Sequence, residues 1–239
     1  NTRDGVISIT DSVGGLTATY MNGATSDTTN GALFDGINNY IELEDFEFGG
    51  VCSFEVYYKF ITQKNGNVVV QFSDTGRTTA TENDLIMLQG DTTNYYNNIR
   101  NNGSNTSVWG NGAMGTTNTN WNHVVWTFNN GTHKQYLNGV EKLTTTGVPM
   151  RTIIRAHHML GNKYDSIYMN GYIKYFRIYQ DLELDANTVT NLFNNRESSQ
   201  PNLLIKNIRK YKGNSSSARQ LSKIRIESVS YTHLTLPTT

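Results

Sequence analysis

The stretch WNHVVWTFNNGTHKQYLNGVEKL, residues 121–143, decides the fold that this sequence predicts. Its first part alternates apolar and polar residues, which is the period of a β-strand with one buried face. The side chains that share the apolar face are Val124, Trp126 and Phe128. The dipeptide Asn138-Gly139 then gives the strongest short-range signal of a β-hairpin, because both residues accept positive φ angles. The stretch therefore predicts antiparallel strands with one face turned to a core.

The same two-residue period occurs on both sides of this stretch. In CSFEVYYKF, residues 52–60, one set of side chains is predicted to face the core: Phe54, Val56, Tyr58 and Phe60. The alternate set is predicted to face outward: Glu55, Tyr57 and Lys59. In GYIKYFRIYQ, residues 171–180, one face is predicted to hold Tyr172, Phe176 and Ile178. Short strands that recur with Gly and Asn turns between them indicate an antiparallel sandwich.

The period changes to that of a helix near the end of this pattern. Apolar residues recur at helical spacing at four positions: Leu184, Val189, Leu192 and Phe193. Asp185 stands where its side chain would cap the first turn. We therefore expect one short helix to close an otherwise all-β unit near Arg196.

Composition limits what the protein can be. Its 239 residues carry no net charge at neutral pH, so the basic face of a nucleic-acid-binding protein is not expected. No stretch approaches the roughly 20 apolar residues that a membrane span requires. Cys52 lies in an apolar run and is expected to be a small buried side chain. His157 and His158 are neighbours on a strand and face opposite ways, so they do not predict a metal site.

Changes in composition and residue pattern divide the chain into three parts. Residues 1–196 hold the strand and helix patterns, whereas residues 197–227 are basic and Ser-rich, as in a linker or a truncated segment. Residues 228–239 resemble a translated sequencing-adapter read-through and are left out of the fold argument. Because the chain begins without methionine, we expect it to be part of a longer multidomain protein.

Four landmarks follow one another in the first part: LFDGINNYIEL at 33–43, CSFEVYYKF at 52–60, WNHVVWTFNNGTHKQYLNGVE at 121–141 and GYIKYFRIYQDLELDANTVTNLF at 171–193. Together they resemble the concanavalin A-like lectin/glucanase superfamily, in its laminin G-like and pentraxin-like branch. The resemblance implies an all-β jelly-roll sandwich of two antiparallel sheets with one short C-terminal helix. It also implies that Trp121 and Trp126 belong to the core and that His123 is structural.

The stretch NNYIELEDFEFGG, residues 38–50, is rich in carboxylates and comes close to E-x-D-x-x-E, the strand motif of laminarinase-type glucanases. Glycosidases use two such carboxylates on either side of the bond that they cleave. Here the middle position is Glu44 rather than Asp, and the resemblance implies a structural strand directly after the F-D-G turn. A structural role is therefore favoured, and the alternative is a glucan hydrolase that uses Glu42 and Glu47.

Pentraxin-like domains hold calcium with two acidic and amide segments, and the matching positions here are Asn83, Asp84, Asn162 and Asp165. Calcium takes roughly 6–8 oxygen ligands, which carboxylates, amides, a backbone carbonyl and water can supply. Lys163 stands where the pentraxin cluster has an acid, and Tyr164 where it has an amide. One expectation is a calcium site of modest affinity, and the other is that these are ordinary turn residues.

A carbohydrate site needs a flat aromatic face with hydrogen-bonding groups around it. The stretch NNIRNNGSNTSVWGNGAMG, residues 97–115, places Trp109 among Gly and Asn residues. Arg100 lies in the same stretch, and Tyr95 and Tyr96 precede it. These residues predict a stacking platform for a sugar ring. The alternative is that Trp109 caps the end of the core.

The sequence thus predicts a non-catalytic carbohydrate-binding module of a larger surface or secreted protein. Its expected partner is a glycan or glycoprotein, and calcium is the candidate cofactor. Loop-borne polar contacts and aromatic stacking on a rigid sandwich would provide the binding. The rival interpretation is a structural or protein-interaction domain of the laminin G-like kind, which a buried Trp109 would favour.

Overall fold

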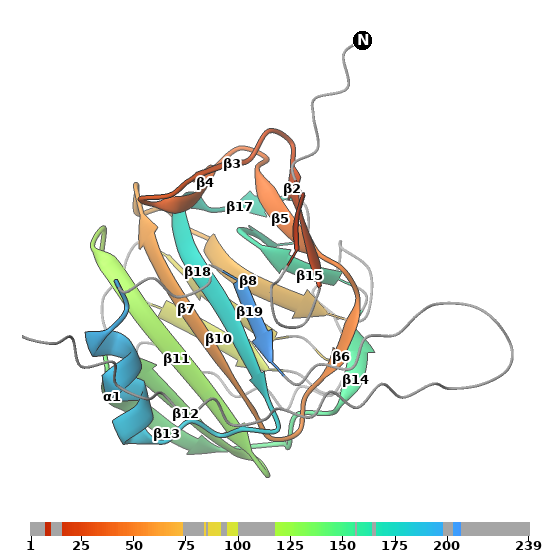
Figure 1. Ribbon diagram of the computed structural model, residues 1–239, viewed down its shortest axis with the longest axis vertical. Helices are drawn as coiled ribbons and strands as arrows, with labels where there is room; N and C mark the ends of the chain where they lie inside the picture. Colours follow the sequence, from red (N-terminus) through yellow and green to blue (C-terminus); the bar gives the residue numbers. More distant parts are fainter. Residues whose placement is uncertain are drawn as a thin grey trace, which may run out of the picture.

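The structure is a computed structural model that describes residues 8–10, 16–73, 84, 86–91, 95–99, 118–155, 157–163, 166–197 and 203–206. Two large β-sheets lie face to face, and helix α1 (Ala186–Asn194) lies against the outer surface of one of them (Figure 1). The predicted all-β sandwich with a short helix near its end is confirmed.

One sheet has seven strands, in the order β1 (Ser8–Thr10), β2 (Thr17–Met21), β5 (Tyr40–Leu43), β15 (His157–Leu160), β8 (Asn67–Ser73), β9 (Ile86–Gly90) and β10 (Tyr95–Ile99). Each neighbouring pair is antiparallel. Strands far apart in the sequence therefore meet in the middle of this sheet, which is the crossed connectivity of a jelly roll rather than a simple meander.

The other sheet has eight strands. Seven follow one another in the order β13 (Val140–Thr146), β12 (Thr132–Leu137), β11 (Trp121–Asn129), β7 (Cys52–Phe60), β18 (Asn170–Gln180), β4 (Gly31–Asp35) and β3 (Thr25–Asp27). The eighth, β19 (Leu203–Lys206), runs parallel to the C-terminal half of β18. Part of residues 197–227, for which the sequence predicts a linker or a truncated segment, thus adds a strand to the sandwich.

Two short ladders extend these sheets: β6 (Phe46–Phe48) pairs with β14 (Ile153–Arg155), and β16 (Asn162–Lys163) pairs with β17 (Ile167–Tyr168). The register of β6 on β14 continues the register of β5 on β15. The β5–β15 and β6–β14 pairs therefore form one line of pairing, which is interrupted where Glu44 lies opposite His157.

The core lies between the two sheets and contains the side chains that the alternation pattern predicted. All of the following are at most 5% exposed: Phe54, Val56, Tyr58, Phe60, Val124, Trp126 and Phe128. Aromatic rings from both sheets meet there, with the Phe54 centroid 6.0 Å from that of Phe72. Cys52 is fully buried, and burial raises the pKa of its thiol to about 12, which suits a packing role.

The predicted common face of Tyr172 and Phe176 is wrong. The pairing of β18 with β7 shifts between Ile173 and Tyr175, so Lys174 is an extra residue in a β-bulge. The bulge reverses the alternation on its N-terminal side. Ile173 consequently joins the core at 4% exposure, and Tyr172 lies on the outer face of the sheet.

The expectation that Trp121 belongs to the core is also wrong. Trp121 lies an odd number of residues before Val124 on β11, so regular alternation turns it to the other face. It is half-buried and stands opposite Lys59 on β7. The resemblance to the family suggested the core, whereas the strand period alone suggests the outer face.

Helix α1 starts at the predicted cap, where the Asp185 carboxylate accepts a hydrogen bond from the Thr188 N–H at 2.7 Å. The apolar side of the helix covers part of the outer face of the eight-stranded sheet. A second apolar cluster forms there from Val125, Tyr136, Tyr179, Leu184 and Val189. Both faces of this sheet are therefore buried beneath α1.

Candidate functional site

The outer face of the seven-stranded sheet carries a group of polar side chains, which we call the polar face: Glu42, Gln71, Ser73, Gln89 and His157. Adjacent strands bring four of them together, and Gln89 lies further along the same face, opposite Val68. Met159 lies opposite Glu42 on one side and Gln71 on the other, and His157 lies opposite Ser73. These residues alternate with core residues of the same strands, so the strand period itself positions them.

The polar face has a buried floor and a more accessible rim. Gln71, Ser73 and Met159 are fully buried, although they point away from the core of the sandwich. Glu42 and Gln89 are half-buried. The Gln89 side-chain oxygen accepts a hydrogen bond from the Lys163 ammonium at 3.3 Å, which brings a cation to the rim.

The acidic residues at the end of β5 interact with one another. Burial raises the pKa of Asp45, and the negative charges of Glu42 and Glu44 raise it further, while His157 opposes them. Glu42 belongs to the seven-stranded sheet, and Glu47 belongs to the β6–β14 ladder and lies opposite Ile154. A carboxyl group with a raised pKa exchanges a proton closer to neutral pH than a free carboxyl group does.

The residues predicted to stack on a sugar are described only in part. Trp109 and Arg100 lie outside the described residues. Tyr95 and Tyr96 form the beginning of β10, where Tyr96 stands opposite Gln89 and Tyr95 opposite Gly90. The backbone thus brings this predicted pair into the same sheet as the polar face.

The predicted calcium ligands are also described only in part, since Asn83 and Asp165 lie outside the described residues. The Asn162 side chain is fully buried, and its amide donates to the Met159 sulfur at 3.5 Å. Asp84 is fully buried, and one of its carboxylate oxygens accepts from the Arg151 guanidinium at 2.9 Å. Within the described part of the chain, no group of three or more His, Cys, Asp or Glu side chains is placed to hold a metal ion.

Asp84 instead belongs to an arrangement of arginines that the sequence did not reveal. Arg155 is fully buried and donates to the backbone oxygens of Asp84, at 2.8 Å, and Phe48, at 3.1 Å. Its guanidinium also lies 4.4 Å from the centre of the Phe48 ring. Positive charge beside Asp84 disfavours a cation there, so the calcium site stays a prediction that the described residues do not strengthen.

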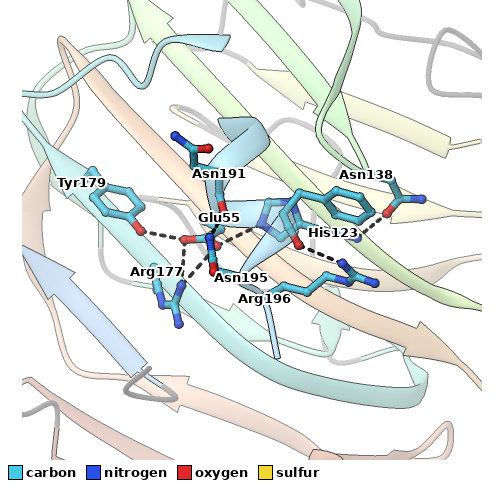
Figure 2. A network of polar contacts seen from close by, with 9 residues as sticks. Glu55, His123, Asn138, Arg177, Tyr179, Asn191, Asn195 and Arg196 are labelled. Atoms are coloured by element: carbon cyan, nitrogen blue, oxygen red, sulfur yellow. Dashed lines mark hydrogen bonds and ion pairs between the residues drawn. The ribbon is translucent and has the colours of Figure 1, made fainter. Parts of the chain in front are cut away.

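The most extensive buried polar network lies on the other sheet, under helix α1 (Figure 2). The Glu55 carboxylate is hydrogen-bonded to the His123 ring nitrogen Nε2 at 2.9 Å and accepts a hydrogen bond from the Tyr179 hydroxyl at 2.6 Å. The Arg177 guanidinium donates to both carboxylate oxygens at 3.1 Å. The backbone N–H of His123 donates to the Asn138 side chain at 2.9 Å, which ties the network to the hairpin turn.

The charge of Glu55 is stabilised by these partners. Burial alone would raise its pKa, but the hydrogen bond to His123, the positive charge of Arg177 and the Tyr179 hydroxyl lower the pKa to about 2. Glu55 and His123 are both fully buried, so a ligand has no access to them. The expected structural role of His123 therefore has a physical basis. The network stabilises the packing of β7, β11 and β18 and is not a binding site.

The comparisons with known proteins agree with this architecture. The family described as the concanavalin A-like lectin/glucanases superfamily matches residues 35–190. The chain therefore belongs to this superfamily. No curated protein shows significant sequence similarity to it.

Several solved structures share the fold. Domain 4 of AbnA, an extracellular arabinanase from Geobacillus stearothermophilus solved in complex with arabinotriose, is similar with a TM-score of 0.51 and 22% identity, over 80% of this chain and 82% of that one. Trypanosoma rangeli sialidase in complex with sialic acid has a TM-score of 0.54 and 12% identity, over 77% of this chain and 30% of that one. The receptor-binding domain of a botulinum neurotoxin of mosaic serotype C/D has a TM-score of 0.56 and 14% identity, over 76% and 46%.

These identities are low, so the likenesses show the fold and not the activity. They include proteins whose structures hold sugars. In the described part of the chain, no helix is long and apolar enough to cross a membrane.

Proposed function

We propose that this protein is a non-catalytic carbohydrate-binding module that holds an oligosaccharide on the polar face. The observation that carries the proposal is the accessible rim of the polar face, where Glu42, Gln89 and His157 are half-buried on strands β5, β9 and β15 of the same sheet. Their carboxylate, amide and imidazole groups can reach a ligand and form hydrogen bonds with the hydroxyls of a sugar.

The chemistry of the polar face suits a sugar. Carboxylate, amide and imidazole groups form hydrogen bonds with hydroxyls, and Met87 and Met159, on the same face, are buried in its floor. All of these residues lie on β-strands in the middle of a sheet. Little conformational entropy would be lost when a ligand binds to such a preorganised surface.

The likeness to sugar-bound proteins supports the same class of ligand. Domain 4 of AbnA is described with arabinotriose and as part of an extracellular enzyme. We propose that this chain likewise binds a glycan or glycoprotein outside the cell or at its surface, as one module of a longer protein. The residues that the sequence predicts for stacking and hydrogen bonding, Tyr95, Tyr96, Arg100 and Trp109, would contribute to the same binding.

The first test is a glycan array probed with the full chain, once with calcium and once with EGTA. We expect the same oligosaccharides to be bound in both, because the polar face contains no predicted calcium ligand. Binding only with calcium would move the site to Asn83, Asp84, Asn162 and Asp165. Absence of binding in both would overturn the proposal and favour the structural or protein-interaction interpretation.

A second candidate function is that of a glucan hydrolase using Glu42 and Glu47. The observation in its favour is that both carboxylates are half-buried on successive strands, β5 and β6, whose pairing partners β15 and β14 also follow one another, and a glycosidase needs two carboxyl groups. Mass spectrometry of an array-positive oligosaccharide after prolonged incubation separates the two functions. We expect the oligosaccharide to stay intact, and shortened products that vanish in Glu42→Gln would show catalysis instead.

A further inference from the structure

The half of the eight-stranded sheet that α1 leaves uncovered carries three aromatic rings, Tyr57, Trp121 and Tyr172, which we call the aromatic strip. The ring centroids of Tyr57 and Trp121 are 4.9 Å apart, and those of Trp121 and Tyr172 are 6.4 Å apart. Trp121 and Tyr172 both stand opposite Lys59, one on each side of β7. The strip therefore crosses three neighbouring strands on the outer face.

The strip is partly accessible and held from below. Trp121 and Tyr172 are half-buried, whereas Tyr57 is only 2% exposed. The Tyr57 hydroxyl donates to the Glu197 carboxylate at 2.6 Å, so the turn after α1 fixes this ring. The two outer rings thus rest on a ring that the fold keeps in place.

The charges around the strip are unequal. Lys174 is neutralised, because its ammonium pairs with the Glu197 carboxylate and also interacts with Asp27. Lys59 is half-buried between Trp121 and Tyr172 and makes no ion pair within the described part of the chain. A cation that makes no ion pair in the described part of the chain, next to two half-buried aromatic rings, is complementary to a ligand that has both a ring and a negative charge.

The position of the strip favours a saccharide over a peptide. Extended peptides bind to sheets by pairing with a free edge strand. The strip instead lies on β11, β7 and β18, whose backbone groups are already used in pairing on both sides. A sugar ring needs only the faces of the aromatic side chains.

We propose that the aromatic strip is a second binding site, separate from the polar face, for an acidic saccharide. The sugar ring stacks on Trp121 and Tyr172, and its carboxylate pairs with the Lys59 ammonium. The two sites lie on opposite sheets, so each binds its ligand without the other.

The test uses trigalacturonic acid and its fully methyl-esterified form, which keeps the rings but removes the charge. Calorimetric titration of the full chain is expected to show binding of the acid and weaker binding of the ester. Trp121→Ala should weaken binding of the acid by about tenfold or more. Lys59→Gln should weaken it by about threefold and reduce its salt dependence. Lys142→Gln, which changes an exposed lysine on β13, is the matched control and should bind like the original chain.

The proposal would be overturned by no binding of the acid, by equal binding of acid and ester, or by unchanged binding in Lys59→Gln. Circular dichroism of each variant confirms that it is folded, and Lys59→Gln keeps the test decisive if Trp121→Ala unfolds. Binding that is lost in Glu42→Ala but kept in Trp121→Ala would place the acid on the polar face, which also contradicts a second site.

Discussion

At the scale of single residues, Glu55 is a charged group that the fold encloses completely. Its carboxylate has two cationic or polar neighbours on adjacent strands, His123 and Arg177, and a hydroxyl from Tyr179. A buried ion is costly unless all of its hydrogen bonds are satisfied. The network therefore fixes the relative positions of β7, β11 and β18 beneath α1.

The replacement Glu55→Gln is expected to reduce stability and its dependence on acid. The folded-state pKa of about 2 lies below the ordinary value of 4.5, so ionised Glu55 contributes about 3 kcal/mol above pH 4.5, and this is lost as the pH falls towards 2. Urea unfolding between pH 5 and pH 2.5 measures the effect. The variant should be less stable at pH 5 and show a shallower slope, whereas a slope like that of the original chain would contradict the network.

His158 makes a second, separate contribution to acid sensitivity. Its ring lies in the core, stacked 4.2 Å from Phe46, and burial together with the positive charge of Arg155 lowers its pKa to about 3. Below pH 6.5 His158 binds a proton in the unfolded chain but stays neutral in the folded chain. The free energy of unfolding therefore falls as the pH drops from 6.5 towards 3.

We expect His158→Phe to remove this part of the slope, because phenylalanine fills the aromatic site and does not titrate. Urea midpoints measured between pH 7 and pH 4.5 should change less in His158→Phe than in the original chain. Glu55→Gln is the control, since its effect lies at lower pH. A steep fall that persists in His158→Phe would mean that another group titrates in this range.

At the scale of elements, local chemistry determined what the sequence could predict. The strands at 52–60 and 121–129 follow from their two-residue period. The hairpin follows from Asn138-Gly139, whose φ angles of 52° and 80° are those of a tight turn. The cap at Asp185 follows from its position before a helical pattern. Each of these signals is contained in a few neighbouring residues.

The features that sequence could not predict depend on pairing between distant segments. The bulge at Lys174 arises where β18 pairs with β7, and nothing in the local sequence marks it. The burial of Glu55 depends on the docking of α1. For the candidate site, alternation predicted that Glu42 faces outward, but only the strand order brings Met159 opposite it and Gln71 on the next strand beyond.

The turn at Gly139 connects two elements, because a Cβ atom there would lie 3.1 Å from the Phe193 ring of α1. Gly23 has nearly the same φ angle, +83° against +80°, with nothing within 4 Å. Gly23→Ala should cost about 1 kcal/mol from backbone strain alone, and Gly139→Ala about 2 kcal/mol. Urea unfolding measures both, and equal losses would contradict the docking of α1 on this hairpin.

At the scale of the whole molecule, the two sheets have different outer faces. Helix α1 covers one half of the outer face of the eight-stranded sheet (Figure 1). The other half carries the aromatic strip. The seven-stranded sheet exposes the polar face. A shared core holds both surfaces rigidly, so a change to one face should leave ligand binding at the other unaffected.

The measurement that tests the central claim most directly is calorimetric titration with an oligosaccharide that binds on the array. Two variants are compared: a double variant that carries both Glu42→Ala and Gln89→Ala, and a control variant that carries Glu141→Ala. Both target residues lie on the rim of the polar face, whereas Glu141 is exposed on β13 of the other sheet. We predict that the double variant loses binding by about tenfold or more while the control binds like the original chain. Unchanged affinity in the folded double variant would contradict a glycan site on the polar face.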